Sequence, residues 1–147
     1  IEDALEAVKS ALDEGIIPGS GITLAKMAKD NRLHIKTIST GEQYGVEIVV
    51  KACQQPLKTI VENGGGKPDV VLAQALDSED EMCYDAVNER FVNAFEAGII
   101  DPAKVTRCAL QNAASVSGLM LTTEALIAEK TVVETKATGG DVGMNGF

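Results

Sequence analysis

Asp3 is the first residue of the sequence whose type and position could support chemistry. It lies in the first turn of a predicted helix, at the border of that helix's apolar arc. A carboxylate held at the lip of a cleft could orient or deprotonate a water molecule. An acidic residue in a first turn also interacts favourably with the helix dipole while remaining solvated. The residues alone leave both interpretations of Asp3 open.

A glycine-rich turn at residues 15–21 follows this helix. Gly15 is a natural helix stop, and Pro18 disfavours a helical conformation of the residue before it. Gly19 and Gly21 let the backbone turn and approach a ligand without a Cβ in the way. If Gly21 opens the next helix, its free N–H groups form an anion site. A plain turn between two helices accounts for the same residues.

Asp101 and Pro102 form the clearest helix start in the sequence. Asp is favoured at the N-cap and Pro at the first helical position, so we predict a helix from here through Leu119. Capping alone is sufficient to account for the Asp101 carboxylate. Binding of a ligand is the alternative role.

Composition limits the class of protein. The 147 residues are 45% hydrophobic but only 3% aromatic, with no Trp, so the core must be built from Ala, Val, Leu and Ile. Such a core favours close-packed helices over a β-sandwich, and the length suits one domain. The net charge of -9 and the lack of a long basic run make nucleic acid and anionic membranes unlikely partners.

Cysteine usage and hydropathy indicate the cellular setting. Cys53, Cys83 and Cys108 are odd in number and widely spaced, which suggests neither a disulfide framework nor a zinc site. We therefore expect a reducing compartment. No apolar run reaches the length of a membrane span, and no signal peptide is recognisable. Because the chain begins inside an amphipathic pattern and lacks an initiating Met, we expect it to be a piece of a longer polypeptide.

The spacing of apolar residues and helix breakers predicts a mainly helical chain with a few short strands. Residues 46–50 give a competing strand signal within a helix expected to be buried, and residues 83–98 fit either a hairpin or a short helix. Residues 77–81 are expected to form a surface loop, and residues 121–127 a terminal strand. The predicted helices are 3–14, one from Gly21 to the turn signal at Asp30 and Asn31, 41–55, a new helix starting at Pro56, a short one opened by Pro68, and 102–119.

These landmarks together resemble the C-terminal part of a group I chaperonin, of the GroEL family. The similarity covers nearly the whole chain, with its motifs in the family's order. The motifs that carry it are IEDAL at 1–5, EGIIPG at 14–19, YDA at 84–86, GIIDPAKVTR at 98–107, AL at 109–110, AASV at 113–116 and TTE at 122–124.

The resemblance implies a subunit of an ATP-driven protein-folding ring. Residues 1–130 would be the C-terminal part of its equatorial domain, mainly helical with a few short strands, and residues 131–147 a flexible tail containing Gly and Met. ATP with Mg²⁺ would be the cofactor, with the phosphate loop and the magnesium ligand upstream of this segment. Expected partners are other ring subunits, a co-chaperonin lid and non-native client proteins, in a bacterial-type cytoplasm or an organelle matrix.

The resemblance also assigns roles to individual positions. Asp3 matches the carboxylate that positions the attacking water. Residues 19–21 match a turn whose backbone contacts the nucleotide, and Asp101 matches the carboxylate that takes the ribose hydroxyls. The full set of implied site residues is Asp3 for hydrolysis, with Gly19, Ser20, Gly21, Asp85, Ala86, Val87 and Asp101 for ATP binding. Of these, Asp85, Ala86 and Val87 match the segment beside the adenine.

The sequence departs from the family pattern in three places. Ser20 replaces a Gly, so if the turn needs a positive φ there, we expect strain on the order of 1 kcal/mol. Cys83 stands where a Gly usually precedes the aromatic residue of the adenine segment. Lys58 and Lys67 are both positive where at least some family members place opposite charges in the ring-to-ring contact. We therefore expect that contact to be weakened or absent.

Two other interpretations compete with an ATPase chaperonin. One is an interaction module of the same ancestry that assembles or binds partners without chemistry. The other is an unrelated helical scaffold, which explains each feature separately but not their order. Because the phosphate loop is expected upstream, we predict that the isolated segment hydrolyses no ATP and that the full-length protein does.

Overall fold

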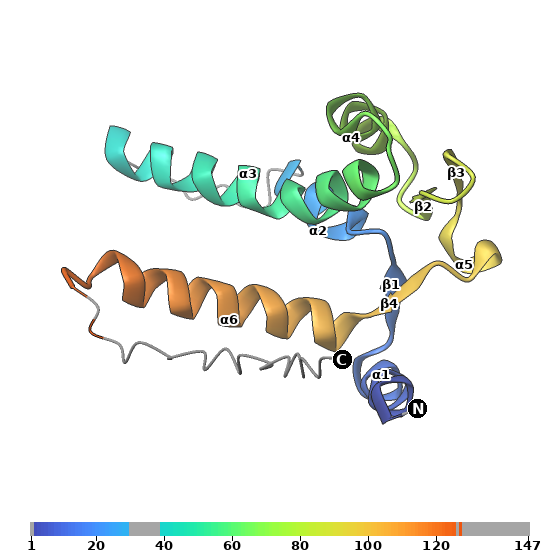
Figure 1. The fold of residues 1–147 in the computed structure, drawn as a ribbon, viewed down its shortest axis with the longest axis horizontal. Coiled ribbons are helices and arrows are strands. Elements are labelled where there is room, and N and C mark those ends of the chain that lie inside the picture. The colour runs from blue at the N-terminus through green and yellow to red at the C-terminus, as the bar shows by residue number, and fades with distance from the viewer. Residues whose placement is uncertain (1, 30–38, 126, 128–147) are drawn as a thin grey trace, which may run out of the picture.

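The computed structural model describes residues 2–29, 39–125 and 127, and these residues are mainly helical with four short strands (Figure 1). This confirms the fold class predicted from the sequence. The predicted tail at residues 131–147 lies outside the described residues. The elements are α1 (Glu2–Glu14), β1 (Ile16–Pro18), α2 (Ile22–Lys29), α3 (Thr40–Asn63), α4 (Pro68–Asp77), β2 (Met82–Asp85), β3 (Arg90–Asn93), α5 (Ala94–Ala97), β4 (Ile100–Pro102) and α6 (Ala103–Leu121).

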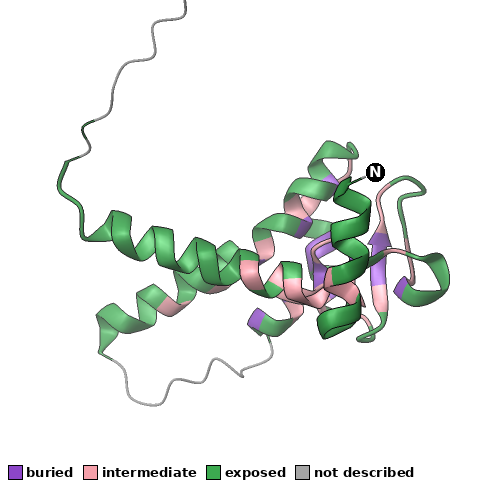
Figure 2. Ribbon diagram, turned by 90° about the horizontal axis from the view of Figure 1, so that it is seen from below, coloured by how far each residue is buried: buried purple, intermediate pink, exposed green. Residues whose placement is uncertain are grey.

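The buried core lies where α2, α4 and the β2–β3 hairpin meet the C-terminal half of α3. Small aliphatic side chains dominate it, as the low aromatic content requires. Figure 2 shows the buried residues gathered there, while the far ends of α3 and α6 are exposed. The largest fully buried side chains are those of Ile22, Leu57, Val61 and Cys83.

Two short strands hold the start of the chain against the start of α6. β1 and β4 pair antiparallel, with Ile17 opposite Asp101. The Gly19 N–H extends the contact by donating to the Ile99 carbonyl over 2.9 Å, and the Ala103 N–H donates to the Gly15 carbonyl over 3.0 Å. The turn at residues 15–21 is therefore fixed by a segment that lies at least 80 residues away in sequence.

The predicted start of α6 was wrong by one residue. Asp101 and Pro102 belong to β4, and α6 begins at Ala103. Pro102 is therefore the N-cap residue, and it provides no side-chain hydrogen bond to the helix. The strand forms because the backbone of residues 100–102 pairs with β1. Pro102 ends a three-residue strand in a two-stranded sheet, a position where its missing N–H is tolerated.

The predicted break at Pro56 was also wrong, because α3 runs unbroken through it for 24 residues. Proline inside a helix removes one hydrogen bond and crowds the preceding turn, at a cost of about 3 kcal/mol. A capping box starts this helix, in which the Ser39 hydroxyl accepts from the Glu42 N–H and the Glu42 carboxylate accepts from the Ser39 N–H. Residues 46–50 are helical, so the competing strand signal was not realised.

Apolar periodicity predicted the helices correctly but not their burial. α1 contains no buried residue, and its Leu12 is 82% exposed. In the N-terminal half of α3, Ile48 is 67% exposed, so the expectation of a buried helix was wrong within this segment. α6 likewise has no buried residue, and towards its C-terminal end Val116, Leu119 and Met120 are exposed.

Residues 83–98 form a hairpin followed by one short helix, which resolves the ambiguity of their pattern. The rings of Tyr84 and Phe91 pack edge to face across β2 and β3, with centroids 5.4 Å apart. Residues 78–81 form the expected exposed loop, although Asp77 still belongs to α4. The predicted terminal strand was wrong for residues 121–125, since Leu121 ends α6 and no strand follows it there.

Candidate functional site

A cavity of about 310 Å³ lies beside the β1–β4 pair, between α2, α3 and α6. This volume is at the lower end of the range for small-molecule sites. Apolar side chains form most of its wall, and Asp101 is the charged residue of its lining. The lining residues are Ile17, Pro18, Gly21, Thr23, Leu24, Pro56, Ile60, Asp101, Pro102, Val105, Thr106 and Ala109.

The Asp101 side chain is partly buried at this wall. Its carboxylate accepts no hydrogen bond from the described residues and does not cap α6, so the capping role predicted for it was wrong. Burial raises the pKa of Asp101. Burial disfavours the ionised form in the folded protein. The carboxylate therefore lowers the free energy of unfolding as the pH rises above its ordinary pKa, and this loss is complete above the raised pKa of the folded state. Asp101 therefore faces the cavity as an acceptor without a structural partner in this part of the chain.

Gly19 and Gly21 are required by packing. A Cβ on Gly19 would lie 3.0 Å from the Ile99 carbonyl oxygen, and a Cβ on Gly21 only 2.7 Å from the Leu57 nitrogen. Gly21 also has a φ of +69°, which favours glycine. The Thr23 hydroxyl donates to the Pro18 carbonyl over 2.8 Å and so ties the turn to α2. Close contact with β4 and α3 is therefore sufficient to explain both glycines.

Ser20 lies between these glycines and replaces a glycine of the family pattern. We expected strain there if the turn required a positive φ, and it does. Its φ is +62°, in the left-handed region where a Cβ is unfavourable. Its hydroxyl oxygen is buried and has no hydrogen-bond partner among the described residues. The loop therefore carries the strain expected for a serine at this position.

The structure brings Gly21 and Asp101 into one cavity lining but leaves Asp3 apart from it. Asp3 is exposed in the first turn of α1. It precedes Gly15 by twelve residues, which corresponds to a helical rise of about 18 Å. Any shared role of Asp3 and Asp101 must therefore involve the two ends of an extended ligand.

The segment of Asp85, Ala86 and Val87 lies at the turn of the β2–β3 hairpin, also outside the cavity lining. The Asp85 carboxylate accepts from the side-chain amide of Asn88 over 2.7 Å and from the N–H groups of Asn88 and Val87. These bonds lower the pKa of Asp85 and hold the turn. Burial, and then the charges of Asp85 and Asp101, raise the pKa of the Cys83 thiol, so the hairpin and β4 share one electrostatic environment.

Comparison with known proteins identifies the family. Residues 1–131 match the TCP-1/cpn60 chaperonin family. The chain belongs to this family. Its fold also matches the crystal structure of a group III chaperonin in the open state, with a TM-score of 0.71 and 23% identity over 80% of this chain. The chaperonin segment spans only 25% of that chain. The resemblance seen in the sequence is thus confirmed at the level of the chaperonin family.

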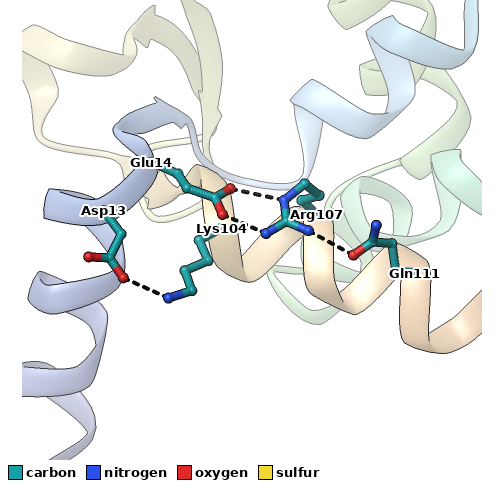
Figure 3. Close-up of polar contacts among 5 residues, drawn as sticks. All are labelled: Asp13, Glu14, Lys104, Arg107 and Gln111. Atoms are coloured by element: carbon teal, nitrogen blue, oxygen red, sulfur yellow. Dashed lines mark hydrogen bonds and ion pairs between the residues drawn. The ribbon is translucent and has the colours of Figure 1, made fainter.

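Two ion pairs join the end of α1 to the first turns of α6 in this chaperonin segment (Figure 3). Arg107 binds both carboxylate oxygens of Glu14, at 2.9 and 2.5 Å, and also donates to the Gln111 side chain. Lys104 binds Asp13 at 2.6 Å. These contacts fix the helix end that leads directly into the turn at Gly15. The sequence reasoning missed them because the partners are more than 90 residues apart.

The Arg107 hydrogen bond lowers the pKa of Glu14 below its ordinary value. A carboxyl group with a lowered pKa contributes stability above its ordinary pKa and loses that contribution as the pH falls through the lowered value. Because both side chains are substantially exposed, the contribution is modest and sensitive to salt.

Sequence reasoning also missed most of the cavity wall. Val105, Thr106 and Ala109 recur at helical spacing on one face of α6, which is the signal that could have identified them. Within residues 2–29, 39–125 and 127 no cluster of three or more His, Cys, Asp or Glu side chains is placed to hold a metal ion. None of the helices in those ranges is both long enough and apolar enough to cross a membrane.

Proposed function

We propose that this chain is part of an ATP-dependent protein-folding chaperonin subunit. The observation that carries the proposal is the Asp101 carboxylate, which is partly buried, free of any capping role and located in a cavity wall. A carboxylate in that state accepts hydrogen bonds from hydroxyl groups such as those of a ribose. Family membership over residues 1–131 supports the same conclusion.

The ordered motifs support a more specific placement, in the C-terminal part of the equatorial domain of a group I chaperonin. The partners in this proposal are other subunits of a ring, a co-chaperonin lid and non-native client proteins. The compartment is a reducing bacterial-type cytoplasm or an organelle matrix. Buried, unpaired Cys53 and Cys83 are consistent with a reducing environment.

Each residue of the proposed ATP site has a role suited to its position. Asp101 accepts from the ribose hydroxyls, and the turn at residues 19–21 presents backbone groups beside it. The Asp85 carboxylate already accepts hydrogen bonds from Val87 and Asn88 within its own turn. The adenine would therefore contact the backbone of Ala86 and Val87. Asp3 orients the attacking water at the far end of the nucleotide. Magnesium-bound ATP supplies the phosphoryl group, and the magnesium ligand is expected upstream of this segment.

A non-catalytic interaction module of chaperonin ancestry is the second candidate. The exposed apolar faces of α1, the N-terminal half of α3 and α6 favour it, because contiguous apolar surface marks contact with other protein. Those faces are compatible with the first candidate as well, since a ring subunit also makes such contacts. ATP turnover therefore separates the two candidates.

The proposal is tested by assaying the full-length protein with ATP and Mg²⁺, together with refolding of a denatured client. We expect magnesium-dependent hydrolysis and ATP-dependent refolding. The isolated 147-residue segment is expected to hydrolyse no ATP. A full-length protein without turnover would favour the interaction module, whereas turnover by the segment alone would contradict an upstream phosphate loop.

We further propose that the contact between two rings is weak in this protein. Lys58 is already paired within its own chain, with Asp69 at 2.7 Å, which reduces the positive charge available to a second ring. Lys67 lies just before α4 and is exposed. We expect electron microscopy of the full-length protein at moderate salt to show single rings, and Lys67→Glu to increase the fraction of double rings. A stable double ring of the unaltered protein would contradict this proposal.

A further inference from the structure

The C-terminal end of α4 carries negative charge that its own sequence does not offset. The last turn of α4 contains no basic residue, and four of the five residues at 77–81 are acidic. A helix C-terminus is itself the negative end of the helix dipole. The N–H and the hydroxyl of Ser78 both donate to the Ala75 carbonyl, so the carbonyls that follow it need donors from outside the helix.

Lys26 of α2 supplies donors to this end of α4. Its ammonium group donates to the Ser78 carbonyl over 3.2 Å and also to the Glu79 carbonyl. Burial lowers the pKa of Lys26, although the charges of Asp80 and Glu79 oppose that shift. The ammonium group is therefore held at the loop against a cost of desolvation, and hydrogen bonds to a charged donor are among the stronger ones in proteins.

Lys29 makes a second, weaker contact with the same helix end. It lies three residues after Lys26 and therefore on the same side of α2. Its ammonium group donates to the Leu76 carbonyl and to the Asp77 carboxylate, over 2.7 Å in each case. Because the side chains of Lys29 and Asp77 are 49% and 81% exposed, solvent screens this pair. Lys26 is thus the stronger link between α2 and the end of α4.

The loop at residues 78–81 is also the base of the β2–β3 hairpin. The Met82 N–H, at the start of β2, donates to the Glu79 carbonyl over 3.0 Å. Directly after β3, the Ala94 N–H donates to the Glu81 carbonyl over 2.8 Å. The side-chain amide of Asn93 donates to the Glu81 carboxylate over 3.0 Å. Both strands of the hairpin are therefore hydrogen-bonded to the loop that is held from α2.

We propose that Lys26 is a latch that closes the loop at residues 78–81 onto α2. Release of its ammonium group lets this loop and the β2–β3 hairpin open together, while the C-terminal half of α3 stays folded. The other end of α2 starts at the turn at residues 19–21, which is fixed by contacts with β4 and α3. The latch therefore sets the position of the hairpin relative to that turn. The proposal does not depend on the binding of a nucleotide.

Hydrogen exchange of the backbone amides at 79–85, measured in the full-length protein, tests the latch. Lys26→Met keeps an apolar stem but removes the ammonium group, and we expect exchange at 79–85 to become about 10-fold faster while the amides at 57–61 are unchanged. Lys26→Ala should behave in the same way and regain its protection in propylammonium chloride, because that cation replaces the missing part of the side chain. Lys9→Ala is the matched control and should leave exchange at 79–85 unchanged, since Lys9 pairs with Glu6 on the exposed surface of α1.

Unchanged exchange at 79–85 in Lys26→Met would overturn the proposal, because packing of the stem would then be sufficient to hold the loop. Equal recovery of Lys26→Ala in tetramethylammonium chloride, which carries the charge but no N–H donor, would overturn it as well. An equal acceleration at 57–61 would show general destabilisation and would also contradict a latch. None of these measurements involves ATP, so their outcome is separate from that of the proposed function.

Discussion

Replacing Gly21 by alanine is expected to destabilise the packing of the turn against α3 by about 3 kcal/mol. The new Cβ would lie 2.7 Å from the Leu57 nitrogen and 3.0 Å from two atoms of Pro56. The nearest of these atoms belong to the backbone of a long helix, which cannot move aside as a flexible side chain would. The positive φ of +69° adds a second unfavourable contribution.

Gly15→Ala is the matched control for this prediction. Gly15 has a φ of +85° but no atom near its hypothetical Cβ, so its replacement carries the backbone cost alone, about 1 kcal/mol. Hydrogen exchange of the backbone amides at 57–61, measured in the full-length protein, reports the local free energy of opening. Equal loss of protection in the two variants would show that the contact with Leu57 and Pro56 does not determine the need for glycine.

Local signals predicted the parts of the fold that depend on neighbouring residues. Gly15 ends α1 as expected, with its N–H donating to the Ala11 carbonyl. Pro68 opens α4, and the apolar periodicity located α1, α2 and α6. In each case the deciding interactions lie within one or two helical turns, so the sequence contains them.

Long-range pairing explains what the sequence could not predict. β1 and β4 are three residues each, too short to produce an alternating pattern, and each becomes a strand only because the other lies beside it. That pairing moved Asp101 from a capping position into a strand. Pro56 remained helical because α3 packs as one long element against α2 and α4.

The candidate site was predictable in part for the same reason. Gly21 and Asp101 were recognisable as candidates from local sequence, and the structure places both in one lining. The apolar wall and the Glu14–Arg107 ion pair depend on contacts across most of the chain. The sequence predicted helices at α1 and α6 but could not show that their apolar faces remain open within this segment.

Replacing Asp3 by alanine in the full-length protein is expected to lower kcat for ATP hydrolysis about 10²- to 10⁴-fold. A carboxylate that orients or deprotonates the attacking water acts mainly in the transition state, so nucleotide affinity should change little. Asp3 is exposed in α1, and its replacement therefore leaves the buried core intact. Steady-state turnover and ADP titration together measure both quantities.

Replacing the neighbouring Glu2 distinguishes this catalytic role from a simple interaction of Asp3 with the helix dipole. Glu2 and Asp3 share the first turn of α1, so both interact with the same helix dipole. If Asp3 acts only through the dipole, Glu2→Ala and Asp3→Ala should affect the protein similarly, and turnover should survive both. If Asp3 orients the water, Glu2→Ala should keep nearly full turnover while Asp3→Ala loses it. Substantial hydrolysis by Asp3→Ala would leave the dipole interaction as its sufficient explanation.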